Sequence, residues 1–465
     1  MPAFLPQKHT ARDLAFLAPL SLFFLLYRLG SGSLASWDEA IYASVAKEAA
    51  LSGDWLRLTL NGSLWFDKPP LAIWMTAVFY KLFGVHEFSA RLFSALCGVG
   101  CVLVTYLIGR QLLNRWTALL GALVLLSSSH FLRFARFGQM EAPLTFFMTL
   151  AFYFFWKGHF KNRYLIFSGV AIGLAVMTKG FAALLLFPVI WLYCLCSGRL
   201  SILTRSSYWI GVMIAVAIAL PWHLVELMRY HAPFMQDVVM RHLVTRTSTP
   251  LEGHAGNLYF YIRVLVNKFH PWILVAFFSA PYFVFRAVKH REDEIIFLSV
   301  WIFFILAVIS AVQTKLPWYV IPIYPALSLT VGDFLSKVFR ESSQLYAKAM
   351  FLAVLVLHVP YSRVFEADYS RDIKGIAAEV ITTVPPGKPL NLYEYHESPA
   401  VSFYIGRTVL YLDDKEAFFK RAAERDFYCL IHARQLENLG ENRLSKQGLN
   451  VKASFEDLRL LVKNG

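Results

Sequence analysis

The chain has 465 residues, of which 57% are hydrophobic and only 16% are charged, and its mean hydropathy is +0.49. This composition excludes an ordinary soluble domain and predicts a protein embedded in a lipid bilayer. The formal net charge of +14 is accounted for by basic loops at the membrane surface and anionic lipid, so no nucleic-acid partner is needed to explain it.

A membrane-spanning helix needs about 20 apolar residues, and this requirement predicts eleven spans in the sequence. They lie near 14–34, 88–109, 116–132, 143–156, 164–178, 180–196, 208–225, 271–285, 294–312, 318–335 and 349–361. A further apolar segment, 70–85, is either another span or a helix lying in the membrane interface. The expected fold is therefore a polytopic α-helical membrane protein.

Lys and Arg are concentrated in alternate short loops, which the positive-inside rule places in the cytoplasm. The opposite loops, 35–87, 133–142 and 226–270, are then expected to face the exterior, or the periplasm if the protein lies in the inner membrane of a Gram-negative cell. Residues 1–360 form the predicted membrane domain. Residues 361–465 have the composition of a small soluble α/β domain, which the same topology places outside. Its expected strands lie at 389–393 and 427–431, and its expected helices at 414–425 and 433–439.

The first external loop carries the most informative residues. Residues 37–43 read Trp-Asp-Glu-Ala-Ile-Tyr-Ala, and residues 65–71 read Trp-Phe-Asp-Lys-Pro-Pro-Leu. Charged groups this close to a membrane span are costly unless they have a function. On spacing alone, Asp38 is either a general base or, like Glu39, a cap of a helix that starts at Ala40.

These two motifs resemble the first external loop of bacterial GT-C glycosyltransferases. The resemblance continues through Gly53-Asp54-Trp55, Thr178-Lys179-Gly180, Pro221-Trp222, residues 242–254 and residues 314–326. In pattern the chain is most similar to the lipid A aminoarabinose transferases, within a group that includes protein O-mannosyltransferases. The resemblance implies a GT-C fold and an inverting transfer of a sugar from a polyprenyl-phosphate donor to lipid A, a glycan or a protein on the outer face of the membrane.

The resemblance also implies roles for the acidic residues. Asp38 matches the catalytic base of the family, with Glu39 capping the helix or orienting the base and Asp67 as a further supporting residue. Glu141 stands where many relatives have a second acidic residue, usually Asp. It either positions the acceptor or contacts a metal, or it forms an ion pair with Arg133 or Arg136.

A phosphate leaving group requires preorganised cations. The candidates for binding the donor phosphate are Lys68, Lys179, Arg246 and Lys315, together with Tyr319 and Tyr324, which match the family pattern near the lipid phosphate. For each lysine the alternative is a side chain that extends to the membrane surface. For the tyrosines the alternative is ordinary packing at the start of a span.

The loop 226–270 contains His231, His242, His254 and His270. Their spacing, about twelve residues or more, does not match a compact zinc motif. We favour a loop that closes over the donor and uses imidazole hydrogen bonds from His242 and His254. A divalent metal ion is the alternative, and its identity is unknown.

A polytopic transporter or flippase of lipid-linked sugars is the alternative function. Transporters usually carry ionisable residues near the middle of the bilayer and often show internal repeats. In this sequence the charged candidates gather at one face of the membrane and no repeat is visible, so the enzyme is the favoured interpretation.

Overall fold

The computed structural model describes residues 7–35, 37–251, 253–338, 354, 365, 368–394, 399–406 and 409–463. The chain divides into two compact units. The first contains residues 1–29, 66–75 and 91–365, and the second contains residues 30–65, 76–90 and 366–465. This division differs from a single boundary at residue 360, because most of the first external loop belongs to the same unit as the C-terminal segment.

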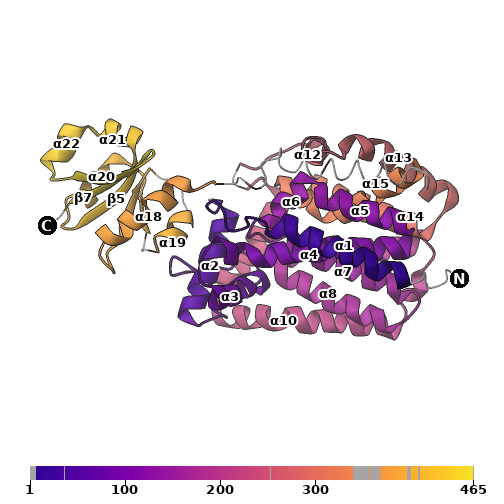
Figure 1. The fold of residues 1–465 in the computed structure, drawn as a ribbon. Coiled ribbons are helices and arrows are strands. Elements are labelled where there is room, and N and C mark those ends of the chain that lie inside the picture. The colour runs from indigo at the N-terminus through magenta and orange to yellow at the C-terminus, as the bar shows by residue number, and fades with distance from the viewer. Residues whose placement is uncertain are drawn as a thin grey trace. The chain divides into compact units, whose positions relative to one another are not determined.

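The first unit is a bundle of helices (Figure 1). Its α-helices are α1 (Gln7–Leu26), α4 (Glu87–Leu112, which begins in the second unit), α5 (Arg115–Ser127), α6 (Ser129–Arg136), α7 (Glu141–Gly158), α8 (Arg163–Lys179), α9 (Leu186–Cys196), α10 (Ser206–Met235), α11 (Arg246–Ser248), α12 (Phe260–Lys268), α13 (Ile273–His290), α14 (Asp293–Ala311) and α15 (Tyr324–Val338). Short 3-10 segments are η1 (Gly180–Leu185), η2 (Leu200–Ile202) and η4 (Pro317–Ile323), and η3 (Gln236–Thr245) is a π-helix.

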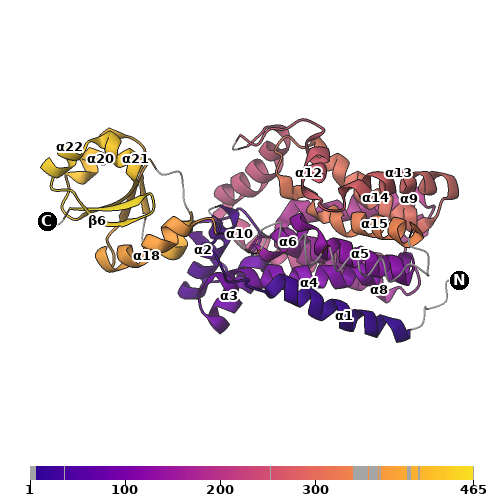
Figure 2. The ribbon, with the colours of Figure 1, turned by 45° about the horizontal axis from the view of Figure 1, so that its top comes forward.

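Helix α8 packs against both α7 and α10 (Figure 1), and α13, α14 and α15 pack against one another (Figure 2). Small residues make the contact between α8 and α10 close. A Cβ atom added at Gly169 in α8 would lie 2.0 Å from the carbonyl oxygen of Gly211 in α10. Two backbones can approach this closely only where both residues lack a side chain, which is a common packing mode of membrane helices.

Six helices in the described part of the chain are long and apolar enough to cross a membrane, or up to seven if the bent pair α5 and α6 counts as one span. Eleven spans were predicted, and the length and composition of the described helices identify six or seven of them as candidates. The predicted spans 164–178 and 180–196 form one apolar stretch of 34 residues, and α15 is only 15 residues long. Helix α7 carries Glu141 and Lys157 in its end turns, which lowers its hydropathy. The predicted span 349–361 lies almost entirely outside the described residues.

The second unit combines part of the first external loop with a small α/β sheet. The loop part contains α2 (Asp38–Ser52), the hairpin of β1 (Thr59–Leu60) and β2 (Ser63–Leu64), and the later turns of α3 (Leu71–Phe83). Helix α3 is the short apolar helix that occupies the segment 70–85.

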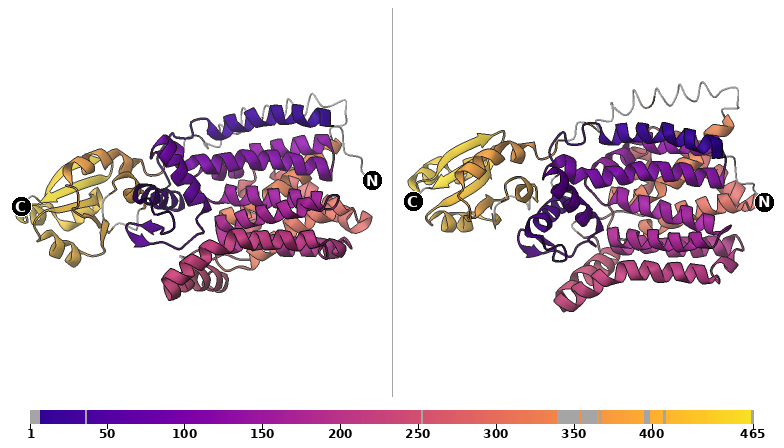
Figure 3. Two further views of the ribbon diagram at one scale, coloured as in Figure 1. Left: turned by 90° about the horizontal axis from the view of Figure 1, so that it is seen from below. Right: turned by 60° about the horizontal axis from the view of Figure 1, so that its bottom comes forward.

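The C-terminal segment contains α18 (Arg371–Thr383), β3 (Leu390–Tyr393), α19 (Pro399–Tyr404), β4 (Val409–Leu412), α20 (Lys415–Ala422), β5 (Phe427–His432), α21 (Ala433–Leu439), α22 (Glu441–Lys446), β6 (Asn450–Phe455) and β7 (Leu458–Lys463). The strand order is β4-β3-β5-β7-β6, in which β4, β3 and β5 are parallel while β7 pairs antiparallel with β5 and β6. Figure 3 shows strands of this sheet as arrows at the yellow end of the colour range. The predicted small α/β domain is confirmed, with β3, β5, α20 and α21 at the expected positions.

Candidate functional site

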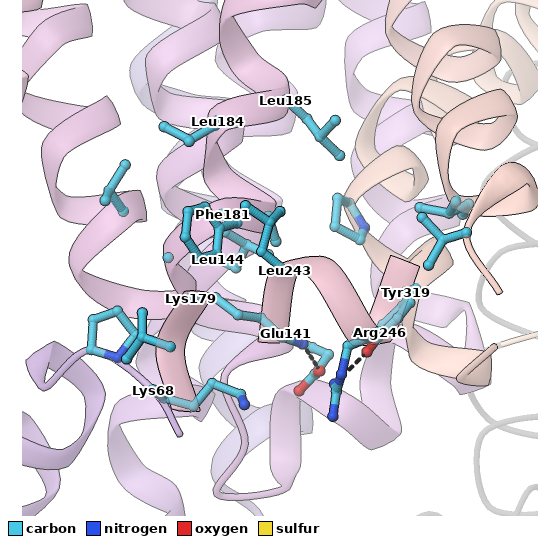
Figure 4. Close-up of a pocket in the computed structure, with 18 of the residues that line it drawn as sticks. Lys68, Glu141, Leu144, Lys179, Phe181, Leu184, Leu185, Leu243, Arg246 and Tyr319 are labelled. Carbon is cyan, nitrogen blue, oxygen red and sulfur yellow. Dashed lines mark hydrogen bonds and ion pairs between the residues drawn. The ribbon is translucent and has the colours of Figure 1, made fainter. Parts of the chain in front are cut away.

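A cavity of about 370 Å³ lies within the first unit (Figure 4). Most of its wall is apolar and comes from α7, α8, η1, η3 and α14, including Leu144, Met148, Val176, Phe181, Leu184, Leu185, Leu243, Ile305 and Ile309. Five charged residues also line it, namely Asp67, Lys68, Glu141, Lys179 and Arg246. An apolar wall with a few converging polar groups is typical of a ligand site.

Glu141 and Lys179 form an ion pair at the cavity wall. Glu141 is the first residue of α7 and Lys179 is the last residue of α8, so the packing of these two helices brings them together. The two side chains are 3% and 12% exposed, respectively. The second carboxylate oxygen of Glu141, Oε2, is buried and has no hydrogen-bond partner among the described residues. The ion pair predicted with Arg133 or Arg136 is thus wrong, and Arg136 instead donates hydrogen bonds to backbone carbonyls of α1.

Gly180 ends α8 directly after Lys179. Its φ of 54° is a backbone conformation that residues with a side chain rarely adopt. The chain therefore leaves the helix at this residue, and the lysine remains at the helix end. The Lys179 ammonium lies 5.3 Å from the ring centroid of Tyr319, another residue of the cavity wall. A cation over an aromatic face is attracted by the ring.

Arg246 and Tyr319 meet beside the Glu141–Lys179 pair (Figure 4). The guanidinium NH1 group donates a hydrogen bond of 2.7 Å to the Tyr319 hydroxyl. The backbone carbonyl of Arg246 accepts a hydrogen bond from the N–H of Thr314, which ties its loop to the segment before η4. The guanidinium Nε is buried and without a partner in the described part of the chain, and so is the indole Nε1 of Trp222.

Three residues of the cavity wall thus each have a buried polar atom that no described residue pairs: Glu141, Arg246 and Trp222. Leaving one such group unpaired costs about 1–3 kcal/mol, and more when it is charged. Native proteins contain few of them, and each requires an explanation. A polar ligand in the cavity would supply the missing partners.

Lys68 and Asp67 reach the cavity from the first external loop. The Lys68 ammonium donates a hydrogen bond of 2.9 Å to the backbone carbonyl of Asp67, and the Asp67 carboxylate lies 3.6 Å from NH1 of Arg241. The ring of Phe66 packs against Tyr230 and Phe234, with centroid distances of 5.2 and 5.5 Å. These contacts fix the loop on η3 and on the end of α10, which is kinked at His231.

Asp38 and Glu39 belong to the second unit, at the beginning of α2. The helix starts at Asp38, two residues earlier than predicted, and its N-cap residue is Trp37, so Asp38 does not occupy the capping position. Glu39 is fully buried and its Oε2 accepts a hydrogen bond of 2.7 Å from the backbone N–H of Ala35. Glu39 therefore stabilises the turn before the helix.

Two predicted phosphate ligands do not line the cavity. Lys315 is buried and its ammonium donates to the backbone carbonyls of Ser310 and Val312, so it binds the carbonyl groups at the end of α14. Tyr324 is fully buried, and its hydroxyl makes a hydrogen bond of 2.7 Å with the Nδ1 atom of His130. Both residues have structural contacts that account for them.

The predicted histidines do not form a cluster in the described residues. The side chain of His254 is exposed and does not line the cavity, and the side chain of His242 lies outside the described part of the chain. No group of three or more His, Cys, Asp or Glu residues in the described ranges could hold a metal ion. We therefore assign no metal ligands.

Sequence reasoning missed several aromatic residues of the site. Trp222 and His223 lie on α10 and Trp318 lies on η4, and all three line the cavity. Their neighbours in the sequence are apolar, so nothing in the local pattern distinguishes them from core residues. Pro221-Trp222 was part of the family resemblance, which was the only signal available.

Comparison with known proteins shows similarity to membrane-bound sugar transferases. The family model for dolichyl-phosphate-mannose-protein mannosyltransferases matches residues 67–224. An uncharacterized protein of Aquifex aeolicus is 32% identical over 348 residues, which cover 74% of this chain and 68% of that protein. The undecaprenyl phosphate-alpha-4-amino-4-deoxy-L-arabinose arabinosyl transferase 2 of Pseudomonas fluorescens is 30% identical over 327 residues, covering 68% of this chain but only 55% of that protein.

Among solved structures, ArnT from Cupriavidus metallidurans bound to undecaprenyl phosphate has the same fold, with a TM-score of 0.80 at 19% identity over 97% of each chain. The protein is thus a polytopic helical membrane protein with a small C-terminal sheet domain. It has the GT-C fold of membrane glycosyltransferases, as the motifs of the first external loop predicted.

Proposed function

We propose that the protein transfers a sugar from a polyprenyl-phosphate donor, and that the cavity of the first unit binds the donor phosphate and the first part of its lipid. The observation that carries this proposal is the composition of the cavity wall. Apolar side chains suited to an isoprenoid chain surround Lys68, Lys179 and Arg246, which are suited to a phosphate. The family model and the arabinosyl transferase relative support the same class of donor.

In the proposed reaction, the bond between the anomeric carbon and the phosphate oxygen breaks while the acceptor hydroxyl oxygen bonds to that carbon. The hydroxyl proton passes to a base, and the bonding electrons leave with the polyprenyl phosphate. A phosphodiester thereby becomes a phosphate monoester, which carries close to a second negative charge at neutral pH. Lys68 and Arg246 would stabilise this developing charge in a site with little water.

Asp38 is the proposed general base. It stands in the first turn of α2, where it is not used as the N-cap, and its neighbour Glu39 fixes the preceding turn. Glu141 is the proposed partner of a sugar or acceptor hydroxyl, because its buried Oε2 can accept a hydrogen bond. Asp67 would support Lys68 from the adjacent position.

The proposed reaction takes place on the periplasmic face of the bacterial inner membrane, with lipid A, a glycan or a protein as acceptor. The aminoarabinose transferases among the relatives make an aminopentose and lipid A the first pair to test. The full chain, reconstituted in nanodiscs, is incubated with undecaprenyl-phosphate-linked aminoarabinose, hexose or hexosamine and with envelope extracts. Mass spectrometry measures released undecaprenyl phosphate and glycosylated product.

We expect Asp38→Asn to reduce transfer roughly 100-fold or more, while undecaprenyl phosphate still binds. We expect Arg246→Met to weaken the binding of undecaprenyl phosphate itself. Arg199→Met, which removes an exposed ion pair with Asp293, serves as the control and leaves both readouts unchanged. No release of undecaprenyl phosphate from any donor, or full activity of Asp38→Asn, would contradict the proposal.

A further inference from the structure

One tyrosine of the C-terminal segment binds both ends of the first external loop. Tyr404 is the last residue of α19 and lies in the same compact unit as the loop ends. Its hydroxyl accepts a hydrogen bond of 2.8 Å from the backbone N–H of Leu34, which directly precedes the loop. The same hydroxyl donates a hydrogen bond of 3.1 Å to Oε1 of Glu87, the residue at which the loop ends and α4 begins.

The contact at Leu34 leads directly to the turn that carries Asp38. The next residue, Ala35, donates its backbone N–H to Glu39, which is fully buried beside Asp38. The carbonyl of Leu34 accepts a hydrogen bond of 2.8 Å from the Ser370 hydroxyl, so both backbone groups of Leu34 are held by the C-terminal segment. A shift of Leu34 would therefore be passed to the first turn of α2.

The rest of α19 packs along α2 and fixes the position of Tyr404. The Lys47 ammonium in α2 donates a hydrogen bond of 2.6 Å to the carbonyl of Phe403, and the Ser44 hydroxyl donates one of 3.3 Å to the carbonyl of Pro399. Isolated helices of this length are not stable in water. Helix α19 therefore keeps its shape because it is packed on the loop, and the two elements form one structure.

The Glu87 end is fixed in the same way. Its carboxylate also forms an ion pair with Lys374 of α18, and both contacts come from the C-terminal segment. The phenol of Tyr404 lies between a backbone donor and a carboxylate acceptor, so one hydroxyl group satisfies both. A phenylalanine at this position would keep the packing of the ring and lose both hydrogen bonds.

We propose that Tyr404 is a positioning residue of the transferase. By joining Leu34 to Glu87, it holds the first turn of α2 in the geometry in which Asp38 can take the acceptor proton. This inference rests on the proposed function, because it assigns to Tyr404 an effect on the proposed base. On this inference, the C-terminal domain contributes to catalysis by holding the first external loop in place.

The test compares Tyr404→Phe with Tyr428→Phe in the full chain. Tyr428 lies in β5 of the same domain, and its hydroxyl has no hydrogen-bond partner in the described residues. We expect Tyr404→Phe to lower the turnover number roughly 10- to 100-fold, the range expected for a misplaced reacting group. Affinity for undecaprenyl phosphate should stay unchanged, because Tyr404 does not line the cavity. Hydrogen exchange should rise at residues 34–40, and Tyr428→Phe should match the wild type in all readouts.

A double variant separates positioning from general destabilisation. In an Asp38→Asn background the base is already absent, so adding Tyr404→Phe should cause no further loss of the residual transfer. A second variant, Glu87→Gln, weakens the other contact of the same hydroxyl and should also lower the turnover number. It provides a test of the inference if Tyr404→Phe does not fold.

The inference is overturned if Tyr404→Phe turns over at the wild-type rate, if Tyr428→Phe loses as much, or if the losses in the double variant multiply. In each of these results the wild type is active, so the proposed function stands. An inactive wild type overturns the proposed function and the role of Tyr404 with it.

Discussion

Replacing Lys179 alone should destabilise the protein more than replacing both members of its ion pair. In Lys179→Met, the carboxylate of Glu141 stays at 3% exposure without its cation, and its Oε2 already has no partner among the described residues. Removing one member of a buried pair costs about 3–5 kcal/mol, whereas replacing both with apolar residues is often neutral. The double variant Glu141→Leu with Lys179→Met should therefore regain most of the stability that Lys179→Met loses.

The size of the effect can be expressed as a melting temperature. An unfolding entropy of about 2.1 cal/mol/K per residue gives about 1 kcal/mol/K for a cooperative transition of all 465 residues. A loss of about 3–5 kcal/mol then lowers the melting temperature by about 3–5 °C. The assay is thermal unfolding in detergent, followed by tryptophan fluorescence.

The matched control is Arg199→Met, because its pair with Asp293 is exposed, at 54% and 24% for the two side chains. Exposed pairs contribute about 0–1 kcal/mol, so this variant should melt within about 1 °C of the wild type. If Lys179→Met melts with the wild type, or if the double variant loses the sum of both single losses, the pair is not a buried electrostatic unit and the reasoning is refuted. The double variant should be stable but inactive in transfer.

Two further predictions concern the backbone after Lys179 and the link between the loop and the C-terminal segment. Gly180→Ala should cost about 1–3 kcal/mol of stability because of its positive φ, and it should lower turnover by displacing Lys179. The control is Gly198→Ala, also at positive φ but with no heavy atom within 4 Å of the added Cβ, which should lose stability alone. Equal turnover in the two variants would contradict this prediction. Burial raises the pKa of Asp368, but the hydrogen bonds from Ser33 outweigh it and hold this pKa below its ordinary value of 3.8. A carboxylate whose pKa is lower in the folded state stabilises the fold at pH values above its pKa in the unfolded state, and this contribution is lost as the pH falls through its pKa in the folded state. The difference in melting temperature between wild type and Asp368→Asn should therefore be present at pH 7 and disappear below about pH 4. A difference that stays constant with pH would contradict this prediction.

The sequence predicted which charged residues would matter better than it predicted their partners. Lys68 and Lys179 stand at the ends of apolar segments, where charge is costly, and they line one cavity together with Arg246 of the loop 226–270. The ion-pair alternative for Glu141 named the wrong partner because Arg133 and Arg136 are close to it in the sequence. Its actual partner is brought near by the packing of α7 on α8, which single-sequence patterns do not encode.

Lys315 illustrates the same limit. A lysine after an apolar helix can either point into a site or bind the free carbonyl groups of that helix, and both give the same sequence pattern. The structure shows the second arrangement. The number of spans is hard to settle from length and composition for a related reason, because a helix buried within the bundle, such as α7 or α15, can be short or carry charge at its ends.

The charge balance of the cavity bears on how the proposed transferase would release its product. Three cations and two carboxylates line the cavity, which leaves a net charge of +1. This matches a phosphodiester donor with one negative charge, whereas the product phosphate approaches two. A wall with three uncompensated cations would bind the product more tightly than the donor, and product release limits many enzymes. The pairing of Glu141 with Lys179 would thus reduce attraction to the product while Lys68 and Arg246 still stabilise the charge that develops in the transition state.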